Sequence, residues 1–395
     1  MTEETGRAGN RLRVAKATTR EEKEAVYRLR YRVVVEEMQK RPDAADHANK
    51  MITDHLDAVA TVLYLSDGTE VVAALRQIWA PDAPESHQVR FYELDKILEV
   101  PRAAMSFTSR LIIAPQYRGT KALGVLLAAI YQEGRSKGVW LDFINCAPPL
   151  VSLYEVMGYR RFMANVLDTD VGLSVPMALV ADDVEYLTRV HSPFARIAAA
   201  FPNDPTHGAW FAKRFADYAQ PSCARVMGTD EFVRYLTERV HVDDYPLLRG
   251  LADAEVKEVL HSGTIVRAQK GNLVVRTGDP GHDMYMVMSG ALEVRGRSKS
   301  GGAHVLETLG KGQIFGEMSF LNGRPRTADV AAMTDAEVLL ITREFLERLT
   351  RGAPAVAARL LMNLSMYLVD RLQNTTQGLV SMMEQRATPP AAAPN

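Results

Sequence analysis

Glycines recur every few residues between Gly271 and Gly323, in a stretch that also contains short apolar runs. This spacing leaves room only for short strands joined by tight turns, which is typical of an antiparallel barrel or roll. Before about Val180 the pattern is different, because strand-like and helix-like segments alternate as they do in α/β layer structures. A chain of 395 residues also exceeds one typical core, so the sequence predicts two or three domains.

The alternating region begins with a predicted helix whose start is marked by Thr19 and Glu22, spaced as in a capping box. Hydrophobic periodicity and turn residues then predict the elements that follow. The predicted helices here are 19–37, 120–137 and 150–157, and the predicted strands are 58–65, 71–79, 106–114 and 139–145. Helical periodicity dominates later at 182–240, 343–349 and 353–383.

Charge and composition argue against several classes of protein. The 47 basic and 48 acidic residues give a net charge of 47 − 48 = −1, which disfavours a globally basic nucleic-acid binder. The 2 cysteines and 9 histidines show no zinc-binding spacing, so we expect no metal site. No apolar run approaches the roughly 18 residues of a membrane span. Residues 1–13 lack the apolar core of a secretory signal, so we expect a cytoplasmic protein.

The segment from Phe315 to Ala328 combines groups that suit a compact sugar phosphate. Gly316 lets the backbone approach a ligand closely, and a helical turn starting at Glu317 would aim free N–H groups at an anion. The Arg326 guanidinium can donate charge-assisted hydrogen bonds to a phosphate, and the Glu317 carboxylate can accept one from a sugar hydroxyl.

The sequence FGEMSFLNGRPRTADV in this segment resembles the phosphate-binding cassette of cyclic nucleotide-binding domains, the family of catabolite-activator-type regulators and cyclic-nucleotide kinases. The resemblance extends over about 243–349 and implies that cAMP or cGMP is the ligand. It implies that Glu317 binds the ribose 2′-hydroxyl and that Arg326 binds the cyclic phosphate. The further nucleotide contacts it implies come from Gly316, Met318, Ser319 and the hydroxyl of Thr327.

Residues 353–383 form one predicted amphipathic helix with leucines such as Leu360, Leu364 and Leu368 at near-heptad spacing. Catabolite-activator-type regulators carry a DNA-reading domain after the corresponding helix, whereas only residues 386–395 follow here, so we expect no DNA binding. Two interpretations of the helix stay open. It is either a packed core helix or the family's hinge helix, which closes over the base and joins two copies as a homodimer.

A second motif lies where the predicted strand 106–114 runs into Pro115-Gln116-Tyr117-Arg118-Gly119. Backbone amides at such a strand-to-helix turn suit a pyrophosphate or the phosphate of phosphopantetheine. The segment resembles the GNAT acyltransferase fold, whose loop pattern is Q/R-x-x-G-x-G/A. Gln116 and Gly119 fill this pattern, while Lys121 replaces its last small residue. The resemblance implies acyl-CoA or acyl carrier protein as the acyl donor.

The opening helix at 29–37 resembles that of acyl-homoserine-lactone synthases and the related long-chain N-acyl amino acid synthases. Further matching positions are Asp54 and Asp57 for their D-x-x-D step, Arg76 for their strand arginine, and Ser109 with Arg110 for the end of their E-x-S-R motif. The glutamate of that last motif is Phe107 here, and an aromatic residue expected after the helix is Lys40. These departures disfavour homoserine-lactone production and fit a broader N-acyltransferase.

Direct transfer from a thioester to an amine needs an aligned thioester, a stabilised oxyanion and a path for protons. By the GNAT resemblance, Tyr154 protonates the leaving thiolate; the alternative is a packing tyrosine beside Gly158. The arginines either bind a carboxylate, a phosphopantetheine phosphate or an acyl carrier protein, or form structural ion pairs with nearby carboxylates. The predicted catalytic residues are Tyr154, Arg110 and Ser109, and the predicted donor- or substrate-binding residues are Arg30, Asp54, Asp57, Arg76, Gln116, Arg118 and Gly119.

These features support three hypotheses of function. The first is a cyclic-nucleotide-regulated N-acyltransferase that moves an acyl group from acyl carrier protein or acyl-CoA to an amine. The second is a non-enzymatic nucleotide sensor with an acyl- or partner-binding domain, and the third is a regulated protein lysine acetyltransferase. The predicted parts are a GNAT-like α/β domain with a mixed sheet flanked by helices (11–181), a helical connector (182–242), a β-roll cyclic nucleotide-binding domain (243–352), a hinge or dimerisation helix (353–385) and a disordered tail (386–395).

Overall fold

The computed structural model describes residues 12–38, 40, 42–168, 172–237, 242–279, 281–297 and 303–387. The chain divides into two compact units, one within residues 1–227 with 272–280 and the other within residues 228–271 with 281–395. Of the tail predicted at 386–395, everything beyond Ala387 lies outside the described residues, as does Arg11 at the other end.

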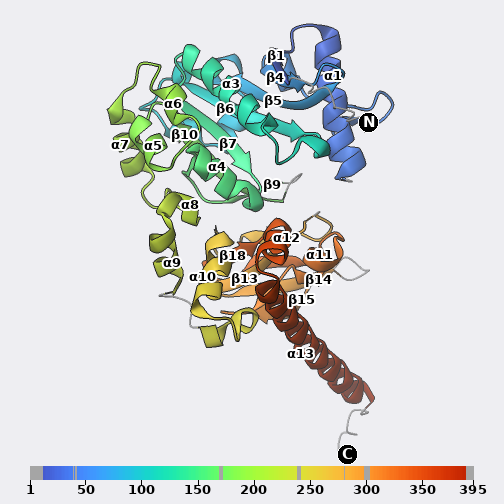
Figure 1. Cartoon of the computed structure of the whole chain (residues 1–395). Helices are drawn as coiled ribbons and strands as arrows, with labels where there is room; N and C mark the ends of the chain where they lie inside the picture. Colours follow the sequence, from blue (N-terminus) through green and yellow to red (C-terminus); the bar gives the residue numbers. More distant parts are fainter. Residues whose placement is uncertain are drawn as a thin grey trace, which may run out of the picture. The chain divides into compact units, whose positions relative to one another are not determined.

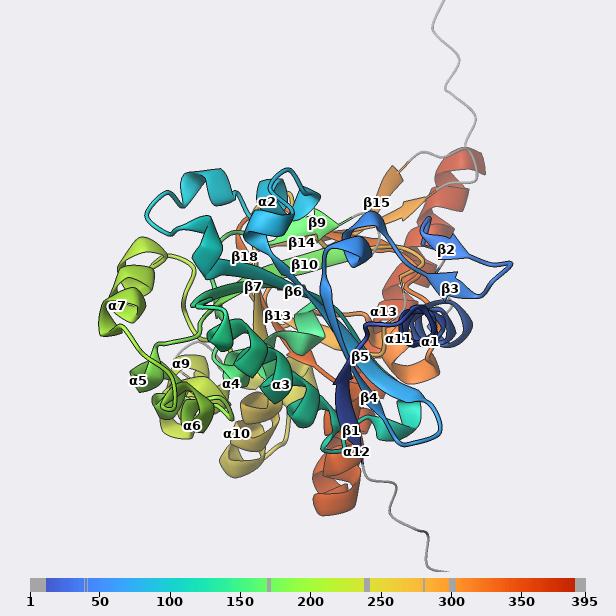
Figure 2. The ribbon, with the colours of Figure 1, turned by 90° about the horizontal axis from the view of Figure 1, so that it is seen from above.

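A mixed β-sheet forms the centre of the first unit (Figure 1). Its order is β1-β4-β5-β6-β7-β10-β8, with β9 paired to β10 (Figure 2). Only β6 and β7 are parallel, and the other pairs are antiparallel. The strands are β1 Arg13–Lys16, β4 Thr61–Ser66, β5 Val71–Trp79, β6 Met105–Ile113, β7 Leu141–Cys146, β8 Arg160–Arg161, β9 Val166–Asp168 and β10 Gly172–Val180. A separate hairpin pairs β2 Ala45–Asp46 with β3 Met51–Ile52.

Helices cover both faces of this sheet because successive strand residues point to opposite sides. On β5, Leu75 belongs to a core cluster that includes Leu126 of α3 (Ala122–Ser136), whereas Ala74 packs in a cluster with Val26 of α1 (Arg20–Tyr31). The first of these clusters also contains side chains of α4 (Val151–Met157). The sheet flanked by helices confirms the predicted α/β class.

Local signals in the sequence set the ends of two helices. Thr19 and Glu22 form the predicted capping box at the start of α1, with the Thr19 side chain accepting from the Glu22 amide. α1 continues into a π-helix, η1 (Arg32–Glu37), so the predicted helix over 19–37 is present with a changed geometry at its end. Gly158 ends α4 with φ of +108°, and a Cβ there would lie 2.3 Å from Leu187 Cδ2. Only glycine fits that position without strain.

The pairing between β6 and β7 is short, and this shapes the centre of the sheet. Their parallel ladder joins Met105, Ser106 and Phe107 to Leu141, Asp142 and Phe143, although β6 continues to Ile113. On its other side β6 is bulged, because its residues Arg110 and Leu111 lie opposite the single residue Leu75 of β5. A bulge bends a strand and increases its twist. β6 therefore leaves β7 just before Arg110.

A series of short helices follows the sheet, as the helical periodicity of 182–240 predicts. They are α5 Val184–Arg189, α6 Ala195–Ala198, α7 Pro205–Arg214, α8 Ala224–Met227 and α9 Thr229–Thr237. The boundary between the compact units falls between Met227 and Gly228, within this series. The five-part division of the chain stays a prediction.

The strands after α9 form two four-stranded sheets, in the orders β11-β18-β13-β16 and β12-β17-β14-β15. Short antiparallel strands with glycine turns are the predicted β-roll. The strands are β11 Thr264–Ala268, β12 Leu273–Val275, β13 Met284–Ser289, β14 Leu292–Arg297, β15 Ala303–Leu309, β16 Ile314–Phe315, β17 Asp329–Ala332 and β18 Ala336–Ile341. The accompanying helices are α10 Asp253–Ser262, α11 Glu317–Asn322, α12 Arg343–Gly352 and the 34-residue α13 Pro354–Ala387 (Figure 1).

Candidate functional site

Three arginines and two aspartates of the first unit meet in one ion-pair network. Arg30 donates from Nη1 to both carboxylate oxygens of Asp57, at 3.0 and 2.8 Å. Arg76 Nη1 lies 2.5 Å from Asp54 Oδ1 and 3.2 Å from Asp57 Oδ1. Arg110 Nη2 lies 3.0 Å from Asp54 Oδ2. The structure thus brings together five of the predicted site residues, and the ion pairs are those of the structural alternative.

Ser109 joins the same network, because Arg76 Nε donates to its hydroxyl at 3.2 Å. The positions of these residues follow from the strands that carry them, since Arg76 and Ser109 are cross-strand partners in the β5–β6 ladder. Asp54 caps the short helical turn at His55–Ala58, and Asp57 completes a capping box there. A capping box explains the Asp-x-x-Asp spacing, and the carboxylate oxygens that accept from the turn also accept from Arg76 and Arg30.

The network carries one excess positive charge. Burial disfavours the charge on Asp54, but hydrogen bonds and charges from Arg76 and Arg110 outweigh it and lower the pKa of Asp54 to about 2. The pKa of Asp57 is also lowered, because Arg30 and Arg76 outweigh its burial. Both aspartates are therefore ionised at neutral pH, and three guanidinium groups against two carboxylates leave 3 − 2 = +1.

Two further observations mark this site as one suited to an anion. Within the described residues, Nε and Nη2 of the buried Arg30 have no hydrogen-bond partner. Arg110 has a φ of +54°, which is uncommon for a residue with a side chain and is typical of strained functional positions. The Arg110 side chain keeps 34% of its surface exposed, so it is the accessible end of the network.

The predicted phosphate loop lies at the surface between β6 and α3. Gln116, Arg118 and Gly119 are exposed, and Gly119 has a φ of +72° that suits glycine. Arg118 pairs with both carboxylate oxygens of Glu37, at 2.6 and 2.9 Å, so its guanidinium is engaged by η1. The assignment of these three residues to a donor phosphate stays a prediction.

Tyr154 lies on α4 within the apolar core of the first unit, and its ring meets the ring of Tyr159 edge to face at 5.5 Å. Burial raises the pKa of the Tyr154 phenol, with smaller contributions from Cys146 and Asp142. The phenol is thus protonated at neutral pH, which is the state that a general acid requires. Among the described residues no hydrogen bond joins Tyr154 to the arginine–aspartate network, and its catalytic role stays a prediction.

The position at which the synthase motif has a glutamate is a core position here. Phe107 is buried and its ring stacks on that of Tyr92, with 5.7 Å between the ring centroids. The centroid of the Phe143 ring lies 6.2 Å away. A carboxylate would be unpaired in these aromatic surroundings. The side chain at 107 therefore contributes to packing and offers no base.

The predicted nucleotide cassette of the second unit forms a tight left-handed turn. Gly316 precedes α11 with a φ of +80°, and a Cβ there would lie 2.7 Å from Arg326 Nη1 and 3.0 Å from the Asp283 carbonyl oxygen. Arg326 Nη1 donates to the carbonyl oxygens of Asp283 and Gly316 at 2.7 and 3.0 Å. The arginine and the start of α11 are thus held side by side, as an anion site needs.

Replacing Gly316 by alanine tests this close approach. We expect Gly316→Ala to destabilise the second unit by about 1–3 kcal/mol, since it adds both a strained φ and a clash with Arg326. The affinity for cyclic nucleotide, measured by calorimetry, should fall together with the stability of the second unit. Gly323→Ala is the matched control, because Gly323 has a φ of +68° but its nearest atoms would lie 3.7 Å from an added Cβ. Equal nucleotide affinities in the two variants would contradict the crowding argument.

Glu317 is paired with a residue that the sequence pattern did not single out. Its carboxylate lies 3.0 Å from Nη1 of Arg371 on α13, and Arg371 Nη2 lies 2.5 Å from Glu307 Oε2. Burial raises the pKa of Glu317, opposed by the Arg371 charge. The two residues are 54 positions apart, so only the docking of α13 brings them together. The sequence offered one signal for this pair, namely that Arg371 is a basic residue on the helix that the resemblance expects to close over the base.

The remaining cassette residues differ in exposure. Ser319 is buried, whereas Met318 is half exposed and Thr327 is exposed. The Thr327 hydroxyl lies 3.8 Å from the Met318 sulfur. Both exposed side chains are free to meet a ligand, and their roles stay predictions.

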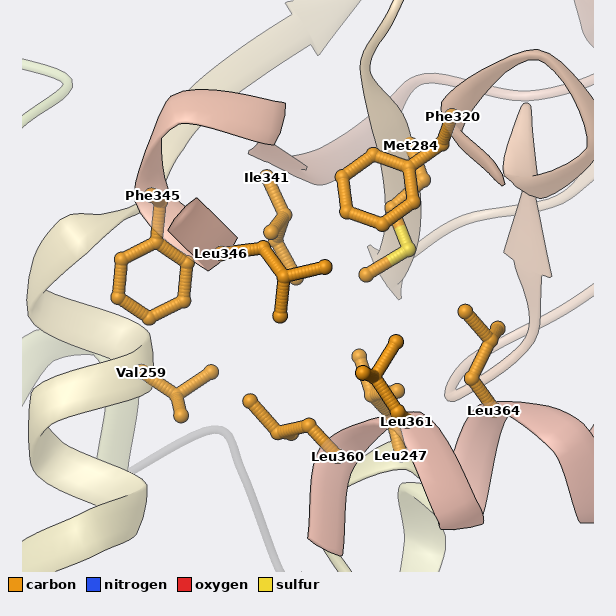
Figure 3. A pocket seen from close by; sticks show the side chains of 10 residues that line it. All are labelled: Leu247, Val259, Met284, Phe320, Ile341, Phe345, Leu346, Leu360, Leu361 and Leu364. Atoms are coloured by element: carbon orange, nitrogen blue, oxygen red, sulfur yellow. The ribbon is translucent and has the colours of Figure 1, made fainter. Parts of the chain in front are cut away.

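An apolar pocket lies between the cassette helix and α13 (Figure 3). Figure 3 shows Phe320 of α11 and Met284 on one side, with Leu361 and Leu364 of α13 on the other. The rest of the lining is Leu247, Val259, Ile341, Phe345, Leu346 and Leu360. Because the two helices share this apolar surface, a shift of α11 changes the packing of α13.

Among the described residues, no three His, Cys, Asp or Glu side chains are grouped so that they could hold a metal ion. Across the same part of the chain, no helix combines the length and the apolar composition that crossing a membrane requires.

Comparison with known proteins now assigns the two units. Residues 29–128 match the model of the acetyltransferase (GNAT) domain, and residues 265–352 match that of the cyclic nucleotide-binding domain. The chain joins a GNAT-type acetyltransferase domain to a cyclic nucleotide-binding domain. The specific resemblance to acyl-homoserine-lactone and N-acyl amino acid synthases stays a prediction.

Similar proteins match this chain over part of their length. The cAMP-dependent protein kinase regulatory subunit of Mycosarcoma maydis is 29% identical over 157 residues, covering 34% of this chain and 30% of the relative. The cyclic AMP receptor protein of Thermus thermophilus is 35% identical over 128 residues, covering 32% of this chain and 57% of the relative. A solved cyclic nucleotide-binding domain from Methylobacillus flagellatus is 22% identical with a TM-score of 0.36, covering 38% of this chain and 85% of that one. The chain thus spans less than two thirds of these two curated relatives.

Proposed function

We propose that the protein is a cyclic-nucleotide-regulated N-acyltransferase, which moves an acyl group from acyl carrier protein or acyl-CoA to an amine. The GNAT-type domain performs the transfer and the cyclic nucleotide-binding domain controls it. The observation that carries the acyl-transfer half is the arginine–aspartate network with its one excess positive charge, at the point where β6 leaves β7.

In the proposed reaction the neutral amine attacks the thioester carbonyl, so that a C–N bond forms and the C–S bond breaks. The amine gives its proton to water, the leaving thiolate takes one from the Tyr154 phenol, and the phenolate recovers a proton from water, so that the protons balance. Arg110 binds an anionic group of a substrate, either a carboxylate of the amine or a phosphate of the donor. The excess charge supports this role, because an anion would bring the network to neutrality. A strained arginine at a bulge also supports it.

The GNAT match also favours a second candidate, in which acetyl-CoA is the donor and a protein lysine is the amine. The two candidates differ in donor length and in acceptor. The resemblance of Arg30, Asp54, Asp57 and Arg76 to the synthase pattern supports a longer acyl chain. One assay that offers acetyl, octanoyl and palmitoyl donors to free amino acids and to protein separates the candidates. A protein that only binds acyl groups would give no acylated product with any of them.

Nucleotide control is supported by the cassette and by the relatives. Glu317 begins α11 and Arg326 lies beside that end of the helix. This arrangement suits a ligand whose ribose hydroxyl meets Glu317 and whose phosphate meets Arg326. The Thermus relative is named a cyclic AMP receptor protein, which supports cAMP ahead of cGMP. We further propose that α13 joins two copies, because several of its large apolar side chains are exposed, namely Met362, Met366, Val369, Leu372 and Leu379.

The Arg110→Ala variant tests the proposed anion site. We expect it to lower kcat/KM for acyl transfer by about 10- to 100-fold, since a charge-assisted hydrogen bond to substrate is lost. The measurement is intact-mass detection of acylated product as a function of time. Arg102→Ala is the matched control, because Arg102 forms an exposed pair with Asp95. Equal rates in the Arg110→Ala variant and the unchanged protein would contradict the proposed site.

A further inference from the structure

A buried carboxylate anchors residues 222–224 of the first unit on α4. Glu155, which follows Tyr154, is 2% exposed. Its Oε1 accepts hydrogen bonds from the Ser222 amide at 3.0 Å and from the Ser222 hydroxyl at 2.7 Å, and its Oε2 lies 3.1 Å from the same amide. Ser222, Cys223 and Ala224 are all buried. The residues just before α8 are therefore part of the core that holds α4.

Hydrogen bonds from this segment favour the ionised form of Glu155. Burial raises the pKa of Glu155, while the hydrogen bonds from Ser222 and the contact with Cys223 oppose that effect. If the segment moved, the carboxylate would lose these donors and would have to bind a proton or shift toward water. Because α4 has only seven residues, a displacement of Glu155 also displaces the neighbouring Tyr154.

On the other side of the unit boundary, α9 is anchored within the second unit. Tyr235 Oη lies 2.9 and 3.0 Å from the two carboxylate oxygens of Glu337 on β18. Glu337 also accepts from Arg267 Nε on β11 at 2.9 Å. Phe232 and Leu236 of α9 are buried. These contacts tie α9 to the β-roll of the second unit.

Between the two anchors the chain has little freedom except at one residue. α8 ends at Met227 and α9 begins at Thr229, so Gly228 alone separates the helices. Gly228 has a φ of +90°, and nothing lies within 4 Å of a Cβ built on it. A glycine in open space is a natural pivot, whereas the short helices on either side transmit displacement.

We propose that residues 222–235 couple the nucleotide domain to the acyl-transfer domain, and that the contact between Ser222 and Glu155 delivers the signal to α4 and Tyr154. Glu155 is a positioning residue in this scheme. When Ser222 is docked, it donates hydrogen bonds to the buried carboxylate of Glu155. When it is undocked, the carboxylate is left without these donors. α4 therefore has two distinct states. The catalytic meaning of the α4 shift rests on the proposed function, but the shift itself does not.

Hydrogen–deuterium exchange of α4 tests the coupling without requiring catalysis. The full-length chain is compared with and without saturating cAMP, and separately with saturating cGMP, and exchange is followed for peptides that contain Val151–Met157. We expect at least one nucleotide to change α4 exchange by about fivefold in the unchanged protein. Ser222→Ala removes the hydroxyl donor to Glu155 and keeps the amide donor, so the change should be smaller than in the unchanged protein, while nucleotide affinity stays as it was. An unresponsive α4 in the unchanged protein, despite bound nucleotide, would overturn the proposal.

Two variants complete the test. Thr206→Ala is the matched control, because it removes an exposed hydroxyl that donates to Asp204 at 2.6 Å in the same helical region. It should keep the full response of α4. Tyr235→Phe removes only the hydroxyl at the second anchor and should reduce the response as Ser222→Ala does, which covers the case that Ser222→Ala does not fold. A full response in Tyr235→Phe or in a folded Ser222→Ala would contradict the proposal. A lack of acylated product would count against the proposed function and leave the exchange result unaffected.

Discussion

Arg326→Ala is expected to weaken cyclic nucleotide binding by about 100-fold, equivalent to ~3 kcal/mol. The guanidinium is the charged donor of the cassette and lies beside the first turn of α11, so its loss leaves the phosphate without its counter-charge. The measurement is calorimetric titration of the full-length chain with cAMP and cGMP. The acyl-transfer domain should keep its fold, because Arg326 belongs to the other compact unit.

The control for this variant is Arg324→Ala, two residues away in the same loop. Arg324 is exposed, whereas Arg326 is 6% exposed, so the control removes an equal charge with little structural consequence. Arg326 also supports the unliganded turn through the carbonyl oxygens of Asp283 and Gly316, and circular dichroism should show whether the variant is folded. A folded Arg326→Ala protein with nucleotide affinity within about twofold of the unchanged chain would refute the assignment.

Asp57→Asn should destabilise the first unit by about 3–5 kcal/mol at neutral pH, because it leaves Arg30 as an uncompensated buried charge. Arg30 and Asp57 are 1% and 2% exposed, so solvent cannot replace the lost carboxylate. Denaturant unfolding, followed by a probe within the first unit, measures the change. Asp95→Asn is the matched control, since Asp95 pairs with Arg102 at the surface and should matter by no more than ~1 kcal/mol.

The same pair predicts a dependence on pH. The network carboxylates have lowered pKa values in the folded chain, about 2 for Asp54, against roughly 3.9 in an unfolded one. A lowered folded pKa contributes stability that is complete above the unfolded value and is lost as pH falls through the folded one. Because the pKa of Asp57 is also lowered, the difference between Asp57→Asn and the unchanged protein should persist at pH 5 to 8 and shrink as the pH falls below about 4. A constant difference over that acidic range would contradict the ionised network.

Much of the fold was predictable because its signals are local. Thr19 and Glu22 mark the start of α1, and Gly158 marks the end of α4, where a Cβ would strike Leu187. The glycine spacing predicted the β-roll for the same reason, because each tight turn needs its own glycine. The bulge at Arg110 was not predicted, because it depends on the register of β6 against β5 and not on the sequence of β6 alone.

The site was predictable only where residue types carry the chemistry. The sequence named the residues of the arginine–aspartate network, but it left open whether they pair with one another, as they do here. Arg371 and Ser222 were missed, because their partners Glu317 and Glu155 are 54 and 67 positions away. Pairs at such separations depend on how helices dock, and docking follows from distributed apolar packing with no short motif.

The rate of acyl transfer in the presence and absence of saturating cyclic nucleotide tests the central claim most directly. The full-length chain is offered acyl-CoA and acyl carrier protein donors with amine acceptors, and product is followed by intact mass. A rate that changes by about fivefold or more with nucleotide, and that is insensitive to nucleotide in Arg326→Ala, is the predicted result. Acyl transfer at the same rate with and without bound nucleotide would contradict regulation, and no product with any donor would contradict the enzyme itself.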